Sequence, residues 1–175
     1  MLTDVIPLII WIAIMIYCGY WVVSVLKMKT NYEISEALAV ASYFTAVLLG
    51  QYFEPFYLNL YLTITGVVLI FIGIFIFISQ VIIMKKIGEG EHWEDTTIII
   101  KKGWFKYMRH PMYFGLAIAN IGVILWFPSF FLIIFSVISF ILCFLSSIWE
   151  DKANIDKFGD AYREYMKKVK LWGIF

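Results

Sequence analysis

Two polar groups stand out in a chain that is otherwise strongly apolar. The first is Arg109-His110-Pro111, with Tyr113 close behind it. Proline favours the first turn of a helix, so Pro111 predicts a helix start, and it biases His110 towards an extended backbone. The free N–H groups of a helix start attract anions, including the carboxylate of a ligand. Each residue taken singly also fits a plainer interpretation, as an interface anchor, a belt aromatic or a routine helix start.

Glu150 is the second polar group. It directly continues an apolar segment, and a carboxylate at that depth costs free energy unless a partner or a ligand meets it. Such a carboxylate can accept hydrogen bonds from hydroxyl or ammonium groups. The sequence is equally consistent with a Glu150 side chain that simply reaches water.

The composition places these groups in a membrane protein. Of the 175 residues, 62% are hydrophobic and 15% are charged, whereas soluble domains average about 45–50% and about 25%. Mean hydropathy is +0.85, so apolar surface must face lipid, which excludes an ordinary soluble enzyme and a disordered chain. The net charge of +1 argues against nucleic acid as the main partner. With only Cys18, Cys143, His92 and His110, we expect no disulfide framework and no metal site.

Five apolar segments approach the length of about 20 residues that a membrane-spanning helix needs. They are Val5–Leu26, Ala37–Phe53, Leu58–Met84, Met112–Phe127 and Pro128–Trp149. The uncharged turn around Pro128 makes the last two a helical hairpin. We therefore predict an all-α integral membrane bundle with five transmembrane helices in a single domain of residues 1–175. Residues 1–84 supply the first three spans, and residues 85–175 supply a polar loop, the hairpin and a tail.

The basic residues predict the orientation. All 14 Lys and Arg fall in the regions 27–36, 85–111 and 150–175. Five spans with the N-terminus outside put all three regions on the cytoplasmic side, as the positive-inside rule requires. The loop and the tail also carry the polar groups described above, so we expect them to fold together into one cytoplasmic site. The small size and the absence of a retrieval signal favour a prokaryotic cell membrane.

Three local sequence patterns predict how particular segments pack. Gly115, Ala119 and Gly122 form a small-residue stripe that would let another helix approach closely. Residues 97–100 are β-branched throughout and too short to span, which indicates an extended stretch against an apolar surface. In the tail, apolar residues from Phe158 to Val169 recur at helical spacing among charged ones, which predicts an amphipathic surface helix.

Two motifs resemble one known family. Residues 103–115, Gly-Trp-Phe-Lys-Tyr-Met-Arg-His-Pro-Met-Tyr-Phe-Gly, resemble the G-x-Y-x-x-x-R-H-P-x-Y-x-G motif of the isoprenylcysteine carboxyl methyltransferase family, which is related to the phospholipid methyltransferases. Residues 150–165, with Glu150-Asp151 and then Phe158-Gly159, Tyr162 and Tyr165, resemble its E-E…F-G-x-x-Y-x-x-Y pattern. The resemblance covers roughly residues 97–166, on both sides of the hairpin.

The resemblance implies an integral membrane enzyme that transfers a methyl group from S-adenosyl-L-methionine to a lipophilic or small-molecule acceptor, at a carboxylate, thiol or amine. The implied cofactor contacts are Thr97, Ile98, Ile99, Ile100, Phe105, His110, Pro111, Met112, Tyr113 and Glu150. Methyl transfer needs neither a metal nor a covalent nucleophile, since alignment of donor and acceptor in a dry pocket can supply most of the catalysis.

The chain departs from the family pattern at two informative positions. Phe105 replaces the first Tyr of the motif, and Ser146 stands where the isoprenylcysteine enzymes carry an Arg linked to the substrate carboxylate. The second departure puts a prenylcysteine acceptor in question. Two alternatives remain: a membrane NADPH oxidoreductase similar to sterol reductases, for which the chain is short, and a non-enzymatic scaffold or transporter subunit. Charges gathered at one interface rather than at the midplane count against a transporter.

Overall fold

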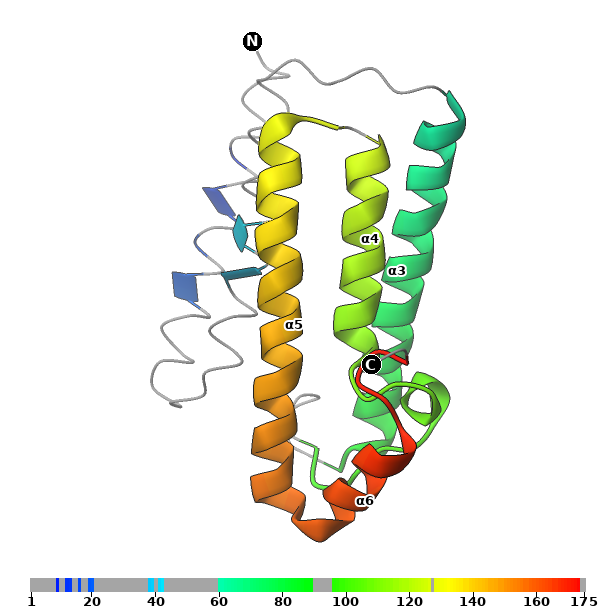
Figure 1. The fold of residues 1–175 in the computed structure, drawn as a ribbon, viewed down its shortest axis with the longest axis vertical. Coiled ribbons are helices and arrows are strands. Elements are labelled where there is room, and N and C mark those ends of the chain that lie inside the picture. The colour runs from blue at the N-terminus through cyan, green and yellow to red at the C-terminus, as the bar shows by residue number, and fades with distance from the viewer. Residues whose placement is uncertain are drawn as a thin grey trace.

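The described chain forms a bundle of long helices with loops and a short helix at one end (Figure 1). The computed structural model describes residues 60–89, 96–126 and 128–173, together with positions 9, 12, 13, 16, 19, 20, 38, 39, 41 and 42. Its elements are α3 (Leu60–Ile87), the 3-10 helix η1 (Gly103–Lys106), α4 (Pro111–Trp126), α5 (Phe130–Phe158) and α6 (Asp160–Lys168). Within these ranges there is no named strand, and the predicted all-α class is confirmed.

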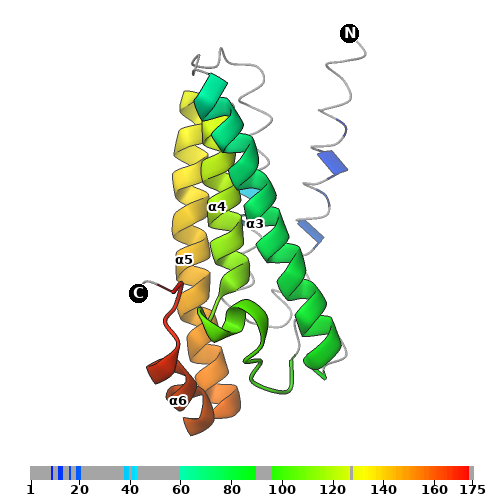
Figure 2. The same cartoon turned by 90° about the vertical axis from the view of Figure 1, so that its right-hand side faces the viewer.

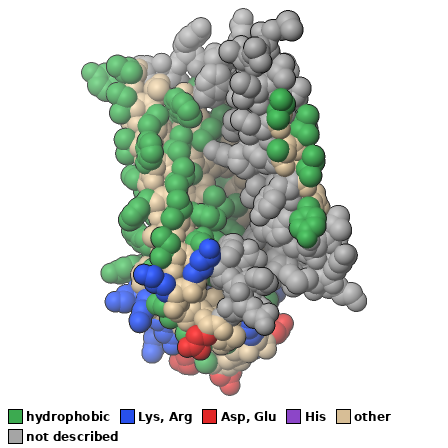
Figure 3. All heavy atoms as spheres, turned by 180° about the vertical axis from the view of Figure 1, so that it is seen from behind, with side chains coloured by type: hydrophobic (Ala, Val, Ile, Leu, Met, Phe, Trp, Pro, Cys, Tyr) green, Lys and Arg blue, Asp and Glu red, His purple; other side chains and the backbone are tan. Residues whose placement is uncertain are grey.

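Two of the described helices, α3 and α5, are long and apolar enough to cross a membrane, and α4 is a shorter apolar helix. Their apolar side chains cover the outer faces of the bundle, whereas charged side chains gather at one end (Figure 3). The predicted spans Val5–Leu26 and Ala37–Phe53 lie almost wholly outside the described residues. The count of five spans therefore stays a prediction.

Glycines bring α3 and α4 into close contact where the two helices cross at an angle (Figure 2). A β-carbon added at Gly66 would lie 2.6 Å from the carbonyl oxygen of Gly122, and one at Gly115 would lie 2.7 Å from that of Gly73. No side chain fits at either crossing, because the two backbones already occupy the space. The predicted small-residue stripe on α4 is confirmed as a helix-packing surface.

The hairpin and the tail follow local signals. Pro111 begins α4 as predicted, and the Ser129 hydroxyl caps α5 by accepting from the backbone N–H of Leu132 at 3.1 Å. Helix α5 then continues past the predicted span end at Trp149, because no helix breaker occurs before Gly159, whose φ of 60° ends it. The amphipathic tail helix is therefore shorter than predicted, running from Asp160 to Lys168.

The loop and the C-terminal segment fold together, as expected. The backbone N–H of Arg109 donates to the carbonyls of Lys170 and Leu171, at 3.0 and 3.1 Å, and that of His110 donates to Leu171 at 3.2 Å. Earlier in the loop, Ile99 packs against the buried cluster of Tyr162, Tyr165 and Val169. The stretch 97–100 thus lies against an apolar surface as predicted, although it bends at residues 97 and 98.

Candidate functional site

An ion pair between Arg109 and Asp151 joins three segments of the chain. The guanidinium Nε donates to both carboxylate oxygens at 3.2 Å, and Nη2 donates to Oδ2 at 2.8 Å. Its Nη1 also donates to the Val169 carbonyl at 2.6 Å. The two side chains are only 10% and 8% exposed. Because a buried charge needs a well-placed partner, this pair holds the loop, α5 and the tail in one arrangement.

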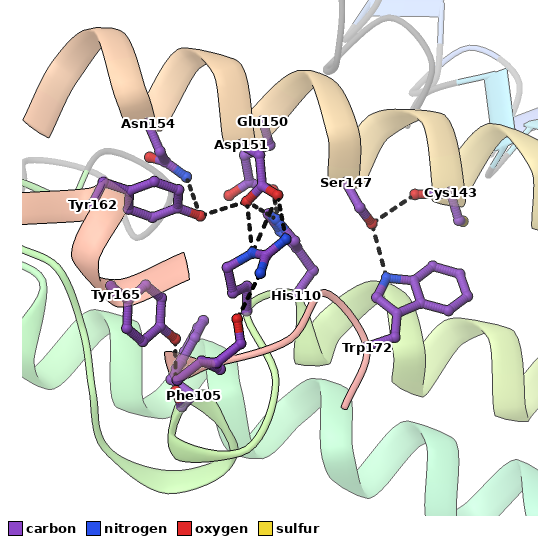
Figure 4. Close-up of polar contacts among 12 residues, drawn as sticks. Phe105, His110, Cys143, Ser147, Glu150, Asp151, Asn154, Tyr162, Tyr165 and Trp172 are labelled. Atoms are coloured by element: carbon purple, nitrogen blue, oxygen red, sulfur yellow. Dashed lines mark hydrogen bonds and ion pairs between the residues drawn. The ribbon is translucent and has the colours of Figure 1, made fainter. Parts of the chain in front are cut away.

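His110 lies between the two carboxylates of α5, as Figure 4 shows. Its Nδ1 is 3.1 Å from Glu150 Oε2, and its Nε2 is 2.8 Å from Asp151 Oδ1. Burial of the ring opposes its charge, but the charge of Glu150 and the hydrogen bonds with both carboxylates raise the pKa of His110 to about 9. At neutral pH the ring is therefore an imidazolium that donates from both nitrogens. The anions that the sequence predicted beside the start of α4 include the chain's own carboxylates.

Two tyrosines of α6 complete the network. The Tyr162 hydroxyl donates to Asp151 Oδ1 at 2.7 Å, and the Tyr165 hydroxyl donates to the Phe105 carbonyl at 2.6 Å. Burial and then the charge of Asp151 raise the pKa of Tyr162, and burial raises the pKa of Tyr165, so both hydroxyls stay protonated donors. Asp151, Tyr162 and Tyr165 belong to the second motif of the sequence, which predicted no individual role for them. The signal in the sequence that could have indicated their role was their spacing within that motif.

A cavity opens beside this network. It is lined by Met84, Thr96, Ile98, Ile99, Ile100, Phe105, Arg109, Glu150, Ala153, Asn154, Lys157, Phe158, Tyr162 and Tyr165. Its volume of about 120 Å³ is several times the roughly 10–15 Å³ that one water molecule needs, so it has room for part of an organic ligand. The isoleucines of the loop make an apolar wall, and Glu150, Asn154 and Arg109 contribute polar groups.

The structure divides the ten predicted cofactor contacts into two sets. Five of them, Ile98, Ile99, Ile100, Phe105 and Glu150, line the cavity. The other five, Thr97, His110, Pro111, Met112 and Tyr113, are not among the residues that line the cavity. The N–H and hydroxyl of Thr97 both donate to the Gly88 carbonyl, at 2.8 and 3.3 Å.

The remaining four lie behind the cavity wall, at the start of α4. His110 reaches the cavity only through its contact with Glu150. Pro111 is fully buried, Met112 is half-buried, and Tyr113 belongs to a buried apolar cluster with Cys143 and Trp172. These residues could position the cavity wall or meet a ligand that extends between α4 and α5.

Trp172 anchors the C-terminal segment, a role that the sequence did not indicate beyond the aromatic residue itself. Its indole N–H donates to the Ser147 hydroxyl at 2.9 Å, and its ring makes edge contacts with Phe114, Phe140 and Phe144. The adjacent Leu171 carbonyl is thereby held against the backbone of Arg109 and His110. Packing on α5 thus fixes the segment that orders the polar network.

The described part of the chain is therefore a helical membrane protein with a polar cavity at one end, and no group of three or more metal-ligating side chains lies in it. The family model described as "Phospholipid methyltransferase" matches residues 61–161, from the start of α3 into α6. That is more than half of the chain, so the protein belongs to the phospholipid methyltransferase family, and the resemblance inferred from the two motifs is confirmed. No curated protein and no solved structure matches the chain.

Proposed function

We propose that this membrane methyltransferase uses S-adenosyl-L-methionine and methylates a lipophilic or small-molecule acceptor at a carboxylate, thiol or amine. The observation that carries the proposal is the cavity, whose apolar isoleucine wall lies opposite a buried acidic network. The isoleucines, Glu150 and Asp151 fall within residues 61–161, the part of the chain matched to the family, and Tyr162 and Tyr165 follow directly after it.

The residues of the cavity fit that cofactor. Ile98, Ile99 and Ile100 suit an apolar adenine, and Phe105 adds a ring on the same side. The Glu150 side chain is 32% exposed, so its carboxylate can accept from ribose hydroxyls or from an ammonium group while it contacts His110. When bound, the cofactor supplies an electrophilic methyl carbon, and catalysis needs no covalent enzyme nucleophile.

The polar network would preorganise the site. The His110 imidazolium fixes the orientation of the Glu150 carboxylate by a hydrogen bond, and the Arg109–Asp151 pair holds the tail segment beside the cavity. Tyr162 and Tyr165 place α6 along one wall of the cavity, where it limits the access of water. Ser146, by contrast, is buried and donates to the Leu142 carbonyl, so the position of the family's substrate-linked Arg supplies no cation.

We further propose that the cavity lies on the cytoplasmic side of a prokaryotic membrane, in a five-span protein with its N-terminus outside. Lys85 and Lys86 end α3 beside the cavity, and Lys157 lines it. Figure 3 shows basic side chains gathered at this end of the molecule. The positive-inside rule places such an end in the cytoplasm.

Calorimetry with S-adenosylhomocysteine tests the cofactor assignment on the full-length protein, purified in detergent. We expect binding by the wild type. Glu150→Gln should weaken it about tenfold or more, as expected for loss of a hydrogen bond to a charged group. Glu164→Gln is the matched control, because Glu164 is exposed on α6 and pairs with Lys167. A folded protein that binds NADPH, or neither compound, would contradict the proposal.

A further inference from the structure

One face of α5 carries a row of buried serines, Ser136, Ser139, Ser146 and Ser147. Serine hydroxyls inside a membrane bundle cost free energy unless they find hydrogen-bond partners, and most of these do. Ser139 donates to the Ala39 carbonyl at 3.2 Å, Ser146 to Leu142 at 2.9 Å, and Ser147 to Cys143 at 2.9 Å. The row by itself is therefore explained as satisfied packing.

Ser136 is the exception in this row, and Asn120 of α4 lies against it. Asn120 Nδ2 on α4 donates to the backbone carbonyl of Ser136 on α5 at 3.0 Å, so the Asn120 side chain contacts the neighbouring helix at Ser136. Asn120 Oδ1 and Ser136 Oγ have no hydrogen-bond partner in the described structure, although the residues are only 5% and 2% exposed. Two unsatisfied oxygens at one buried contact point to a missing polar group.

Tyr113 connects this contact to the cavity end. It lies on the same side of α4 as Asn120, about two helical turns or about 10 Å nearer to the cavity. Its hydroxyl is also buried without a partner in the described chain, and its ring lies 5.8 Å from that of His110. Figures 1 and 2 show α4 and α5 side by side over this whole distance. Tyr113 and Asn120 thus share one side of α4, and Asn120 contacts Ser136 on α5.

The chemistry of the pair restricts the missing group. An amide oxygen only accepts hydrogen bonds, whereas a serine hydroxyl can both donate and accept. A ligand hydroxyl has both functions, since it can donate to Asn120 Oδ1 and can accept from Ser136 Oγ. An ammonium could only donate and would carry a charge into the apolar bundle, which is costly. A neutral alcohol therefore satisfies both groups best.

We propose that Asn120 and Ser136 bind a hydroxyl group of the methyl acceptor. This inference rests on the proposed function and names the class of its substrate: an apolar, membrane-soluble alcohol lying between α4 and α5. Its hydroxyl sits at the Asn120–Ser136 pair, and its methyl-accepting end lies about 10 Å away, towards Tyr113 and the cavity. Asn120 and Ser136 are specificity residues that touch the acceptor far from the reacting atoms.

The test measures methyl transfer from radiolabelled S-adenosyl-L-methionine to a total membrane-lipid extract in mixed micelles, as a function of extract concentration. We expect Ser136→Ala and Asn120→Ala each to raise the half-saturating extract concentration about tenfold, with the maximal rate within about twofold of wild type, since one buried hydrogen bond is lost far from the chemistry. Ser139→Ala is the matched control, because Ser139 is buried on the same row but has a partner in Ala39. It should leave the half-saturating concentration unchanged.

Calorimetry with S-adenosylhomocysteine on the same preparations separates the two proposals. If the wild type does not bind S-adenosylhomocysteine, the proposed function itself is wrong. If the wild type binds it but transfers no methyl group to the extract, the acceptor is not a membrane alcohol and this inference fails. It fails equally if the Ser136 and Asn120 variants saturate at the wild-type extract concentration, which would mean that the pair holds only a water molecule.

Discussion

Raising the pH from about 6.5 to about 10 should destabilise the folded protein, because it deprotonates the His110 imidazolium, whose two nitrogens donate to the carboxylates of Glu150 and Asp151. The pKa of His110 is raised from 6.5 to about 9, and its side chain is only 2% exposed, so solvent screens the interaction little. Each pKa unit corresponds to about 1.4 kcal/mol, which gives a contribution of about 3 kcal/mol. Since the folded pKa lies above the unfolded one, this stabilisation is complete below pH 6.5 and disappears as the pH rises through 9.

Thermal unfolding of the detergent-solubilised protein, followed by circular dichroism at a series of pH values, measures this loss. His110→Gln should be less stable than wild type at pH 6.5 and should lose most of the pH dependence between 6.5 and 9. His92→Gln, which replaces the only other histidine of the sequence, should keep the wild-type profile. An identical pH dependence in wild type and His110→Gln would refute the reasoning, because the stabilisation would then come from another group.

Three further substitutions test the packing and the network by the same unfolding measurement. Gly66→Ala should lower the free energy of unfolding by about 1–3 kcal/mol, because its β-carbon meets the backbone of α4, whereas Gly19→Ala meets no atom of the described residues within 4 Å and should lower it far less. Asp151→Asn should lower the free energy of unfolding by about 3–5 kcal/mol, because it leaves the buried Arg109 guanidinium and His110 imidazolium without a full partner. The control Asp160→Asn should change the stability little, because the Asp160 side chain is fully exposed. Trp172→Phe should cost about 1 kcal/mol through the lost indole hydrogen bond, and an unchanged stability would contradict its role as an anchor.

Much of the fold could be predicted because its signals are local. Long apolar runs place α3 and α5, Pro111 sets the start of α4, and the small residues of α4 mark its contact with α3. The end of α5 was harder to predict, because polar residues after Trp149 continue the helix as well as apolar ones do. Five of the ten residues that were expected to contact the cofactor line the cavity, and their role as contacts stays a prediction.

The pairings inside the site depended on information that no local pattern carries. The positive φ at Gly159 turns α6 back beside the loop, and only that turn brings Tyr162 to Asp151 and the Val169 carbonyl to Arg109. The sequence singled out Glu150 and predicted no role for Asp151. Successive positions on a helix point in different directions, however, so Asp151 is buried in the network while Glu150 also reaches the cavity.

The sequence by itself determined that this protein belongs in a membrane, which of its described segments form helices, and that its charges gather at one end. Those properties follow from composition and periodicity, because lipid accepts apolar side chains and hydrogen-bonded helices whatever their neighbours are. Only the tertiary structure decided which charged groups pair, and which polar atoms between α4 and α5 remain without partners. Those outcomes depend on contacts between residues far apart in the chain, and such contacts exist only after the helices have packed.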